Sequence, residues 1–273
     1  MNDMMHRMGR QASFLMRRMK IEVRYLLKRD VPNAVEIETL AACNRKCAYC
    51  PVSLAPARNG VMEFGLYHKI VEDLCEIKYR NPIQFHFYNE PLLDHRLELF
   101  VSYASLKLPK CKINIYTNGD LLTKERVYSL FSSGSDMIRI SHHDAKSESR
   151  ISRLMEELDE QTCSKIVRVR YYGHDGPLTN RAGLVTLPKE QAMIDRRAGC
   201  SWVNMLVVNC DGEVPLCCND FHVVNGFGSL KHNSVKEIWT HSRRLRKEIN
   251  SGKYDLEICL ACDTNTGEAG SPA

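Results

Sequence analysis

CNRKCAYC, residues 43–50, places three cysteines at spacings of four and three residues on one short stretch. A structural zinc site closes its tetrahedron with a fourth Cys or His, and the intervening Asn44, Arg45 and Lys46 supply neither. A four-iron cluster held by three thiolates instead leaves one iron for an outside molecule. The stretch therefore indicates an iron–sulfur site with one open position. It follows a strand that the alternating run VEIETL (35–40) predicts.

The segments after this loop alternate between helical and strand-like patterns. Helical spacing of apolar residues predicts helices near 66–77, 94–107, 123–133 and 147–160, and strand-like runs occupy 82–88, 111–116, 137–141 and 165–172. Strands separated by helices predict a parallel sheet with crossover connections. Five to six strands rather than eight predict an α/β fold of the partial-barrel type, open at one side.

Polar segments follow three of the predicted strands, although an ordinary connecting loop would not require polar residues at these positions. They read YNEP (88–91), YTNGD (116–120) and SHHD (141–144). In parallel sheets the chemistry collects at the carboxyl ends of the strands. We therefore expect these three loops to lie beside CNRKCAYC.

The pattern changes from about residue 173 onward. Beyond Cys200, the stretch 203–216 predicts two short strands around Asp211 and Gly212. Ser234 and Glu237 form a capping-box pattern that opens a helix running to about Asn250, with Gly252 placed to end it, and CLAC (259–262) closes the segment. These features predict a small C-terminal domain built from a β-hairpin and a helix.

The whole chain is expected to have four parts: a basic amphipathic N-terminal helix (1–34), the partial barrel (35–185), the small domain (186–265) and a disordered tail (266–273). Residues 1–30 carry eight Lys/Arg and three Asp/Glu, which accounts for the net charge of +5. The simpler interpretation of this segment is a helix that packs on the main domain, and the alternative is contact with a membrane surface. The basic segment lacks the interleaved aromatic residues of nucleic-acid binders.

The location indicated by the sequence is the cytoplasm. No apolar segment near the start of the chain reads as a signal peptide, so the twelve cysteines do not indicate a secreted disulfide framework. No stretch approaches the roughly 18 apolar residues that a membrane span requires.

The cysteine loop resembles the signature of the radical S-adenosylmethionine (SAM) superfamily, CxxxCxxC with an aromatic residue before the last cysteine. The matching positions are Cys43, Cys47, Tyr49 and Cys50. The resemblance implies a [4Fe-4S] cluster whose open iron binds SAM, and reductive cleavage of SAM to methionine and a 5′-deoxyadenosyl radical. It implies further SAM contacts by Tyr49 near the adenine, by Glu90 of YNEP at the methionine amino group, and by Asn118 and His142 near the ribose. Asn89 stands where the family's GGEP-type motif has glycine.

A second set of cysteines, Cys200, Cys217, Cys259 and Cys262, supplies four ligands, enough to close a cluster completely. The arrangement resembles the short auxiliary-cluster module called twitch, a short form of the SPASM domain, which implies one auxiliary [4Fe-4S] cluster. Zinc is the structural alternative for four such thiols. Cys75, Cys111, Cys163 and Cys210 read as small core residues. Cys218, directly after a ligand, is an alternative ligand, a filler or a thiol that faces the substrate.

Longer stretches resemble the 2-deoxy-scyllo-inosamine dehydrogenases, a twitch family that oxidises an aminocyclitol. The shared stretches are VEIE, FHFYNEPLL, IYTNGDLLT and LTNRAG. The resemblance implies substrate contacts by Glu36, Tyr88, Tyr116, Arg181 and Asn219, with Arg181 at the reacting hydroxyl. An arginine is a poor base at its usual pKa, so we expect Arg181 to polarise and hold the alkoxide. Cys218 and Asn219 replace the Phe-Glu of that family, so a carboxylate that could pair with a substrate amine is missing.

The sequence leaves four functions open. The first is a radical dehydrogenase that oxidises a secondary alcohol of a small polyol, sugar or aminocyclitol to a ketone, with the auxiliary cluster accepting the electron and an outside donor such as flavodoxin or ferredoxin reducing the first cluster. The second is an epimerase in which Cys218 returns a hydrogen atom. A ribosomal-peptide maturase and a non-enzymatic iron–sulfur or zinc protein are the others. In the first two, the catalytic candidates are Arg181, Tyr88 and Cys218.

Overall fold

The computed structural model describes residues 16, 19, 30–55, 59–172, 178–186, 199–253 and 255–263. Most of the expected N-terminal helix (1–34), the stretch 187–198 and the expected tail (266–273) lie outside the described residues. None of the helices described is long and apolar enough to cross a membrane.

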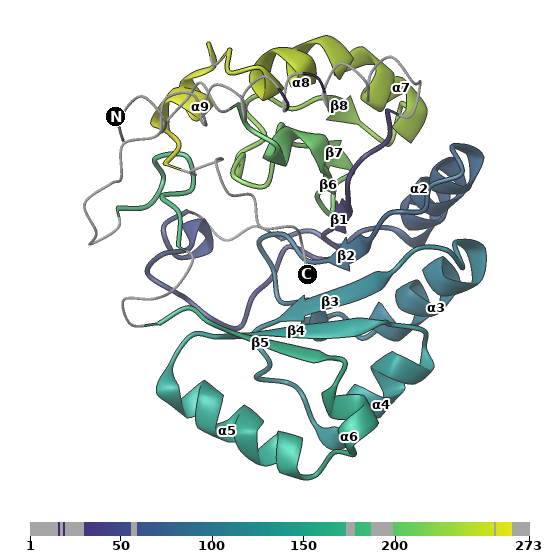
Figure 1. Ribbon diagram of the computed structural model, residues 1–273, viewed down its shortest axis with the longest axis vertical. Coiled ribbons are helices and arrows are strands. Elements are labelled where there is room, and N and C mark those ends of the chain that lie inside the picture. Colours follow the sequence, from purple (N-terminus) through teal and green to yellow (C-terminus); the bar gives the residue numbers. More distant parts are fainter. Residues whose placement is uncertain are drawn as a thin grey trace, which may run out of the picture.

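Six parallel strands form the main sheet, in the order β5-β4-β3-β2-β1-β6. Their bounds are β1 Val35–Ile37, β2 Ile83–Phe85, β3 Ile113–Thr117, β4 Met137–His142, β5 Ile166–Arg170 and β6 Leu206–Val208. The crossover helices are α2 Phe64–Glu76, α3 Leu97–Lys107, α4 Lys124–Ser132, α5 Ala145–Glu156 and α6 Glu160–Cys163. The predicted alternation of strands and helices is confirmed. In Figure 1, α2, α3 and α4 lie along one side of the sheet.

The two faces of the sheet differ sharply in polarity because residues alternate along each strand. One face carries Val35, Ile37, Ile83, Phe85 and Ile115, which are buried with the apolar sides of α2, α3 and α4 in one core. Each such fully buried side chain stabilises the fold by about 1.5–3 kcal/mol. The opposite face carries Glu36, Gln84, Asn114 and Tyr116. This polar face is the interior of the partial barrel.

The C-terminal region contributes to both the sheet and a separate small domain. The turn expected at Asp211 and Gly212 is present, with the Gly212 N–H donating to Asn209 O. The strand before the turn, β6, pairs in parallel with β1, whereas β7 (Glu213–Val214) pairs antiparallel with β8 (Gly228–Ser229). The predicted pair of strands in 203–216 is therefore divided between two sheets. Val207 and Val208, buried on both faces, suit an edge of the barrel better than an exposed hairpin.

Two helices occupy the span where one was expected. They are α7 (Val235–His241) and α8 (Arg243–Asn250), followed by α9 (Glu257–Ala261). The predicted capping box of Ser234 and Glu237 is confirmed. The single helix was wrong because Ser242 interrupts it: its hydroxyl donates to Trp239 O at 3.2 Å and offers the backbone an alternative to the regular ladder. Figure 1 places α7, α8 and α9 beyond the β6 edge of the sheet, away from β5.

Candidate active site

Main-chain hydrogen bonds of the two residues before Cys43 attach the three-cysteine loop to the barrel. Ala41 N–H donates to Gly60 O at 2.8 Å, and Glu90 N–H donates to Ala42 O at 2.8 Å. Within the loop, Arg45 N–H donates to Cys43 Sγ at 3.4 Å. Cys43, Cys47 and Cys50 are each partly exposed. Three thiols on a short loop that already directs an N–H at sulfur suit an anionic iron–sulfur cluster.

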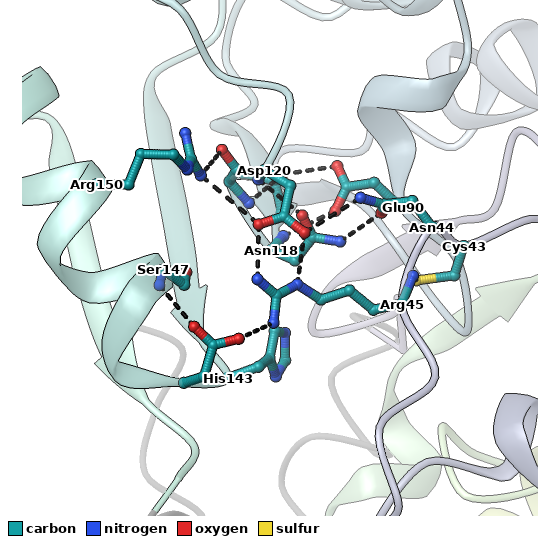
Figure 2. A network of polar contacts seen from close by, with 12 residues as sticks. Cys43, Asn44, Arg45, Glu90, Asn118, Asp120, His143, Ser147 and Arg150 are labelled. Atoms are coloured by element: carbon teal, nitrogen blue, oxygen red, sulfur yellow. Dashed lines mark hydrogen bonds and ion pairs between the residues drawn. The ribbon is translucent and has the colours of Figure 1, made fainter.

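Arg45 connects the cysteine loop to the loops after β3 and β4. Its Nε and Nη2 each donate to one carboxylate oxygen of Asp120 at 2.6 Å, and its Nη1 donates to Asp144 Oδ2 at 2.7 Å (Figure 2). Asn44 adds a hydrogen bond to the same Asp120 at 3.1 Å. A bidentate, charge-assisted pair of this kind fixes geometry as well as adding energy. The expectation that the loops after these strands lie beside the cysteine loop is confirmed.

Glu90 is buried and accepts three hydrogen bonds. The donors are Leu92 N–H at 3.0 Å, the Thr117 hydroxyl at 2.6 Å and Asn118 N–H at 2.7 Å. Burial raises the pKa of Glu90 to about 7 although these hydrogen bonds lower it. Asn118 in turn donates through Nδ2 to Asn44 Oδ1 at 2.7 Å, so the YNEP and TNG segments meet the cysteine loop directly (Figure 2).

Tyr49 of the cysteine loop meets the end of β4, where His142 is the last strand residue and His143 follows it. The Tyr49 hydroxyl contacts His143 Nδ1. Burial lowers the pKa of His143 to about 4, so its imidazole is neutral at pH 7. His142 is 2 % exposed, and neither of its ring nitrogens has a hydrogen-bond partner among the described residues. Sequence reasoning selected His142 for the cofactor and missed His143, which is the histidine that contacts the aromatic residue of the motif.

Four polar side chains from neighbouring strands gather on the interior face. His86 Nε2 lies 3.2 Å from Glu36 Oε1. The His86 and Tyr116 rings stack with their centroids 4.3 Å apart. The Arg139 guanidinium also lies over the Tyr116 ring, 5.4 Å from its centroid. Glu36 and Tyr116 were predicted from the resemblance, whereas His86 and Arg139 were not. The alternation of Gln84 and His86 with Ile83 and Phe85 was the signal that could have found His86.

Tyr88, Arg181 and Cys218 form a second polar group at the C-terminal side of the barrel. The Arg181 guanidinium lies 5.7 Å from the Tyr88 ring centroid. Burial lowers the pKa of Arg181, but Tyr88, Cys218 and Cys50 together raise it by more than burial lowers it, so the guanidinium stays protonated. Burial, with Glu36 adding to it, raises the pKa of Cys218 well above its usual value, which keeps the thiol protonated. The charge of Arg181 therefore acts on both Cys50 of the cysteine loop and Cys218.

The turn that carries Arg181 has an unusual backbone. Arg181, Ala182 and Gly183 all have positive φ, at 49, 55 and 86°. Two consecutive non-glycine residues in this region store strain, which the surrounding structure must hold. Asn180 keeps the turn in this conformation, because its N–H donates to Asp263 Oδ1 at 2.7 Å and its Nδ2 donates to Ala261 O at 2.8 Å.

The second set of cysteines converges in the small domain. Cys200, Cys217 and Cys259 pack around one apolar group formed by Val203, Leu216 and Ile249. Cys262 lies close enough to Cys217 to act on its charge, and it accepts a hydrogen bond from Asn219 Nδ2 at 3.5 Å. The donor set, four thiols at an apolar centre, suits a closed iron–sulfur cluster. In the described parts of the chain, no three His, Cys, Asp or Glu side chains are arranged around a single metal ion, so the assignment of a cluster rests on the number and chemistry of the thiols.

Comparison with known families gives the same two parts. Residues 37–190 match the radical SAM superfamily, and residues 200–263 match the SPASM iron–sulfur cluster-binding domain. The chain belongs to the radical SAM superfamily. The first match begins at the last residue of β1 and covers the cysteine loop and the strands β2 to β5, and the second covers all four cysteines of the other set. The predicted cofactor chemistry of [4Fe-4S] clusters with SAM is that of these families.

Similar proteins narrow the class of radical SAM enzyme. The S-adenosyl-L-methionine-dependent 2-deoxy-scyllo-inosamine dehydrogenase of Niallia circulans is 32 % identical over 240 residues, which cover 84 % of this chain and 92 % of that protein. The crystal structure of BtrN in complex with AdoMet and 2-DOIA matches with a TM-score of 0.75 and 29 % identity, covering 85 % of this chain and 93 % of BtrN. AdoMet-bound anSMEcpe, at 13 % identity and a TM-score of 0.55, shares the fold, with 84 % of this chain and 90 % of that chain covered. The recognition of a radical SAM enzyme that resembles this dehydrogenase is confirmed.

Proposed function

We propose that this radical SAM enzyme oxidises a secondary alcohol of a small polyol, sugar or aminocyclitol to the ketone. The 32 % identity to a dehydrogenase of an aminocyclitol, over most of both chains, supports the reaction class. The observation that carries the proposal is the place of Arg181. Its charge acts on Cys50 of one cysteine set and on Cys218, next to a member of the other, while it lies over Tyr88. A small substrate held there would have both metal centres close to it.

Each residue has a defined part in this proposal. Cys43, Cys47 and Cys50 hold one cluster, and Cys200, Cys217, Cys259 and Cys262 hold the other, within domains that we place at 35–185 and 186–265. Tyr49, Glu90, Asn118 and His142 bind SAM. When bound, the first cluster and SAM supply the radical that takes hydrogen from the substrate carbon, and the second cluster supplies an electron acceptor. Arg181 remains a cation and holds the oxygen that becomes the carbonyl.

The substrate preference follows from the residues near Cys218. Asn219 Nδ2 donates to Cys262 Sγ at 3.5 Å, so part of its amide group is already bonded to a proposed ligand of the second cluster. An amide cannot pair with a substrate ammonium as a carboxylate would. We therefore favour a neutral polyol or sugar over an aminocyclitol. Flavodoxin or ferredoxin is the expected electron donor, in a cytoplasmic setting.

Anaerobic turnover of ring-deuterated cyclitols tests the proposal. The reconstituted enzyme is given SAM, a reductant and either scyllo-inositol or 2-deoxy-scyllo-inosamine, and products are analysed by mass spectrometry. We expect one deuterium in 5′-deoxyadenosine for each ketone, with scyllo-inositol the better substrate. SAM cleavage without ketone from either compound, or an unoxidised product of inverted configuration, contradicts the dehydrogenase.

One observation favours a second candidate, a radical epimerase. The thiol of Cys218 stays protonated and lies near Arg181 and Glu36, where it could return a hydrogen atom to a substrate radical. In that case Cys218→Ala abolishes product while SAM cleavage continues. In the dehydrogenase, the same variant keeps both clusters and still makes ketone.

A further inference from the structure

The interior face of the barrel holds buried polar atoms that no protein group satisfies. Glu36 Oε2 and the Tyr88 hydroxyl are each shielded from solvent and have no hydrogen-bond partner among the described residues. An unsatisfied buried polar atom costs about 1–3 kcal/mol. Atoms of this kind on neighbouring strands are a place where a hydroxyl-bearing ligand would be bound, since such a ligand both donates and accepts.

Glu36 is the acceptor in this group. It extends from β1, is 2 % exposed, and uses only Oε1 toward His86, at 3.2 Å. Its charge acts on Cys218, and the charge of Arg181 also acts on Cys218. Glu36 and Arg181 therefore both lie within electrostatic reach of Cys218, one with a carboxyl group and the other with a guanidinium. Oxidation of a carbinol needs both kinds of group, one to take the hydroxyl proton and one to hold the oxygen.

We propose that Glu36 Oε2 is the base that takes the substrate's hydroxyl proton, and that His86 is the positioning residue that holds Glu36 through Oε1. This inference rests on the dehydrogenase proposed above. After its C–H hydrogen has left, the substrate carbon radical gives one electron to the C-terminal cluster and its O–H proton to Glu36. The C–O bond becomes a carbonyl, the cluster is reduced by one electron, and Glu36 becomes neutral. Arg181 is protonated throughout and is not the base.

His86 is suited to support this step. Its side chain is 23 % exposed against 3 % for that of Glu36, so it is the member of the pair nearer to solvent. Stacking on Tyr116 at 4.3 Å fixes the plane of the imidazole. Among the titratable and charged groups around the pair, Tyr116 and Cys218 both feel the charge of Glu36. The Arg139 guanidinium lies over the Tyr116 ring, and the charge of Arg181 acts on Cys218.

The test separates hydrogen abstraction from ketone formation. Full-length, reconstituted Glu36→Gln is given SAM and whichever of ring-deuterated scyllo-inositol and 2-deoxy-scyllo-inosamine the unmodified enzyme oxidises. We expect deuterium to enter 5′-deoxyadenosine as before, whereas ketone formed per 5′-deoxyadenosine falls roughly 100-fold, the usual size of a general-base effect. Glu38→Gln is the control, since it makes the same change at another buried carboxyl, which directly follows β1 and accepts from Cys210 N–H at 3.2 Å, and it should keep the ratio.

The pH dependence of the ketone ratio and the contact between Glu36 and His86 give further readouts. The ketone ratio of the unmodified enzyme should fall at acid pH, and this fall should be absent in Glu36→Gln. His86→Gln should shift the midpoint of the fall, whereas a structural role alone would lower the ratio equally at every pH. In the full chain without clusters, Glu36→Gln should alter the ¹⁵N imidazole resonances of one histidine, which His86→Gln identifies.

The remaining outcomes overturn the inference. An unchanged ketone ratio and pH profile in Glu36→Gln would show that another group is the base. Loss of deuterium transfer in that variant would show that Glu36 acts before the proton leaves. If the unmodified enzyme forms no ketone at all, the dehydrogenase itself fails, which is a different result from either of these.

Discussion

Asn180 and Asp263 bond to each other twice: the N–H of Asn180 donates to Asp263 Oδ1 at 2.7 Å, and the N–H of Asp263 donates to Asn180 Oδ1 at 3.1 Å. The first residue precedes Arg181 and the second follows Cys262. The turn that presents the arginine is thus attached to the chain at a ligand of the second cluster. Positioning of Arg181 depends on that attachment, because its backbone conformation is strained.

Asn180→Ala removes the side-chain part of this attachment. We expect turnover to fall about 10- to 100-fold, since a small displacement of a positioned group is costly. Iron content should stay within the range of the unmodified enzyme, because no cysteine is changed. Measurement of kcat alongside iron per chain checks this. A variant that loses iron and activity in parallel would assign Asn180 to cluster retention instead.

Arg45→Ala should weaken the cluster at the three-cysteine loop. The change removes three charge-assisted hydrogen bonds. It leaves Asp144 without its arginine partner and Asp120 with only the longer ion pair to Arg150, at 3.7 Å, beside an anionic cluster. Iron and sulfide analysis should show about one of two clusters lost on gel filtration. Lys112→Ala breaks an exposed ion pair with Asp136 elsewhere on the barrel and serves as the control, with no loss expected. Full iron content in Arg45→Ala would contradict the role.

SAM binding should depend on pH through Glu90. The pKa of Glu90 is raised to about 7 by burial, so below pH 7 the carboxyl is largely protonated. If the carboxylate form accepts from the amino group of SAM, binding must release that proton, and affinity should fall by up to about tenfold per pH unit below 7 and level off above it. Anaerobic equilibrium dialysis between pH 5.5 and 8.5, roughly spanning this range, measures it. Glu90→Gln cannot ionise, so it should bind more weakly and show no slope; a retained slope would assign the pH dependence elsewhere.

Gly199→Ala should remove the second cluster alone. Gly199 has φ of 72°, and a Cβ there would lie 1.9 Å from Asn250 O, so the segment before Cys200 must shift. We expect loss of about four irons per chain, with SAM cleavage at the first cluster preserved. Gly65→Ala is the matched control, because a Cβ at Gly65 meets nothing within 4 Å. Equal iron content in the two variants would show that the segment before Cys200 can shift while Cys200 still binds the second cluster.

Arg246→Leu should destabilise the small domain. Arg246 is fully buried, bonds both carboxylate oxygens of Asp30 at 3.0 and 2.8 Å, and stacks on Trp239 at 3.6 Å. Breaking a buried ion pair costs about 3–5 kcal/mol, and Asp30 would keep only the Trp239 indole N–H at 3.1 Å and Arg243 at 3.7 Å. Arg244→Leu, on the same helix with a side chain 90 % exposed, should cost less than about 0.5 kcal/mol. Anaerobic thermal unfolding of the two variants should differ clearly, and equal melting temperatures would exclude the buried pair as a source of stability.

Much of the barrel could be predicted because polarity alternates along its strands. In VEIETL the apolar residues Val35 and Ile37 pack on helices, and Glu36 between them faces the interior, which the alternation alone indicates. The cysteine loop, Glu90 and Asn118 were found because they belong to short motifs at strand ends. His86 has the same alternation, yet it was read only as part of a strand.

Contacts between distant segments could not be predicted. Nothing local in the sequence pairs Arg45 with Asp120, 75 residues away, or Asn180 with Asp263, 83 residues away. These bonds exist because the fold brings loop ends to one edge. Likewise Leu206–Val208 carries a strand signal but no indication of its partner, so its place beside β1 appears only in the structure.

That place beside β1 limits how the two regions can be separated. The sixth strand lies beyond Cys200, so the C-terminal part is not an independent cassette attached to a finished barrel. A truncation before residue 200 would uncover the outer edge of the very strand that leads to the three-cysteine loop, and uncovered parallel edges invite aggregation. Modular exchange of this region between enzymes would therefore have to carry the strand across together with its cysteines.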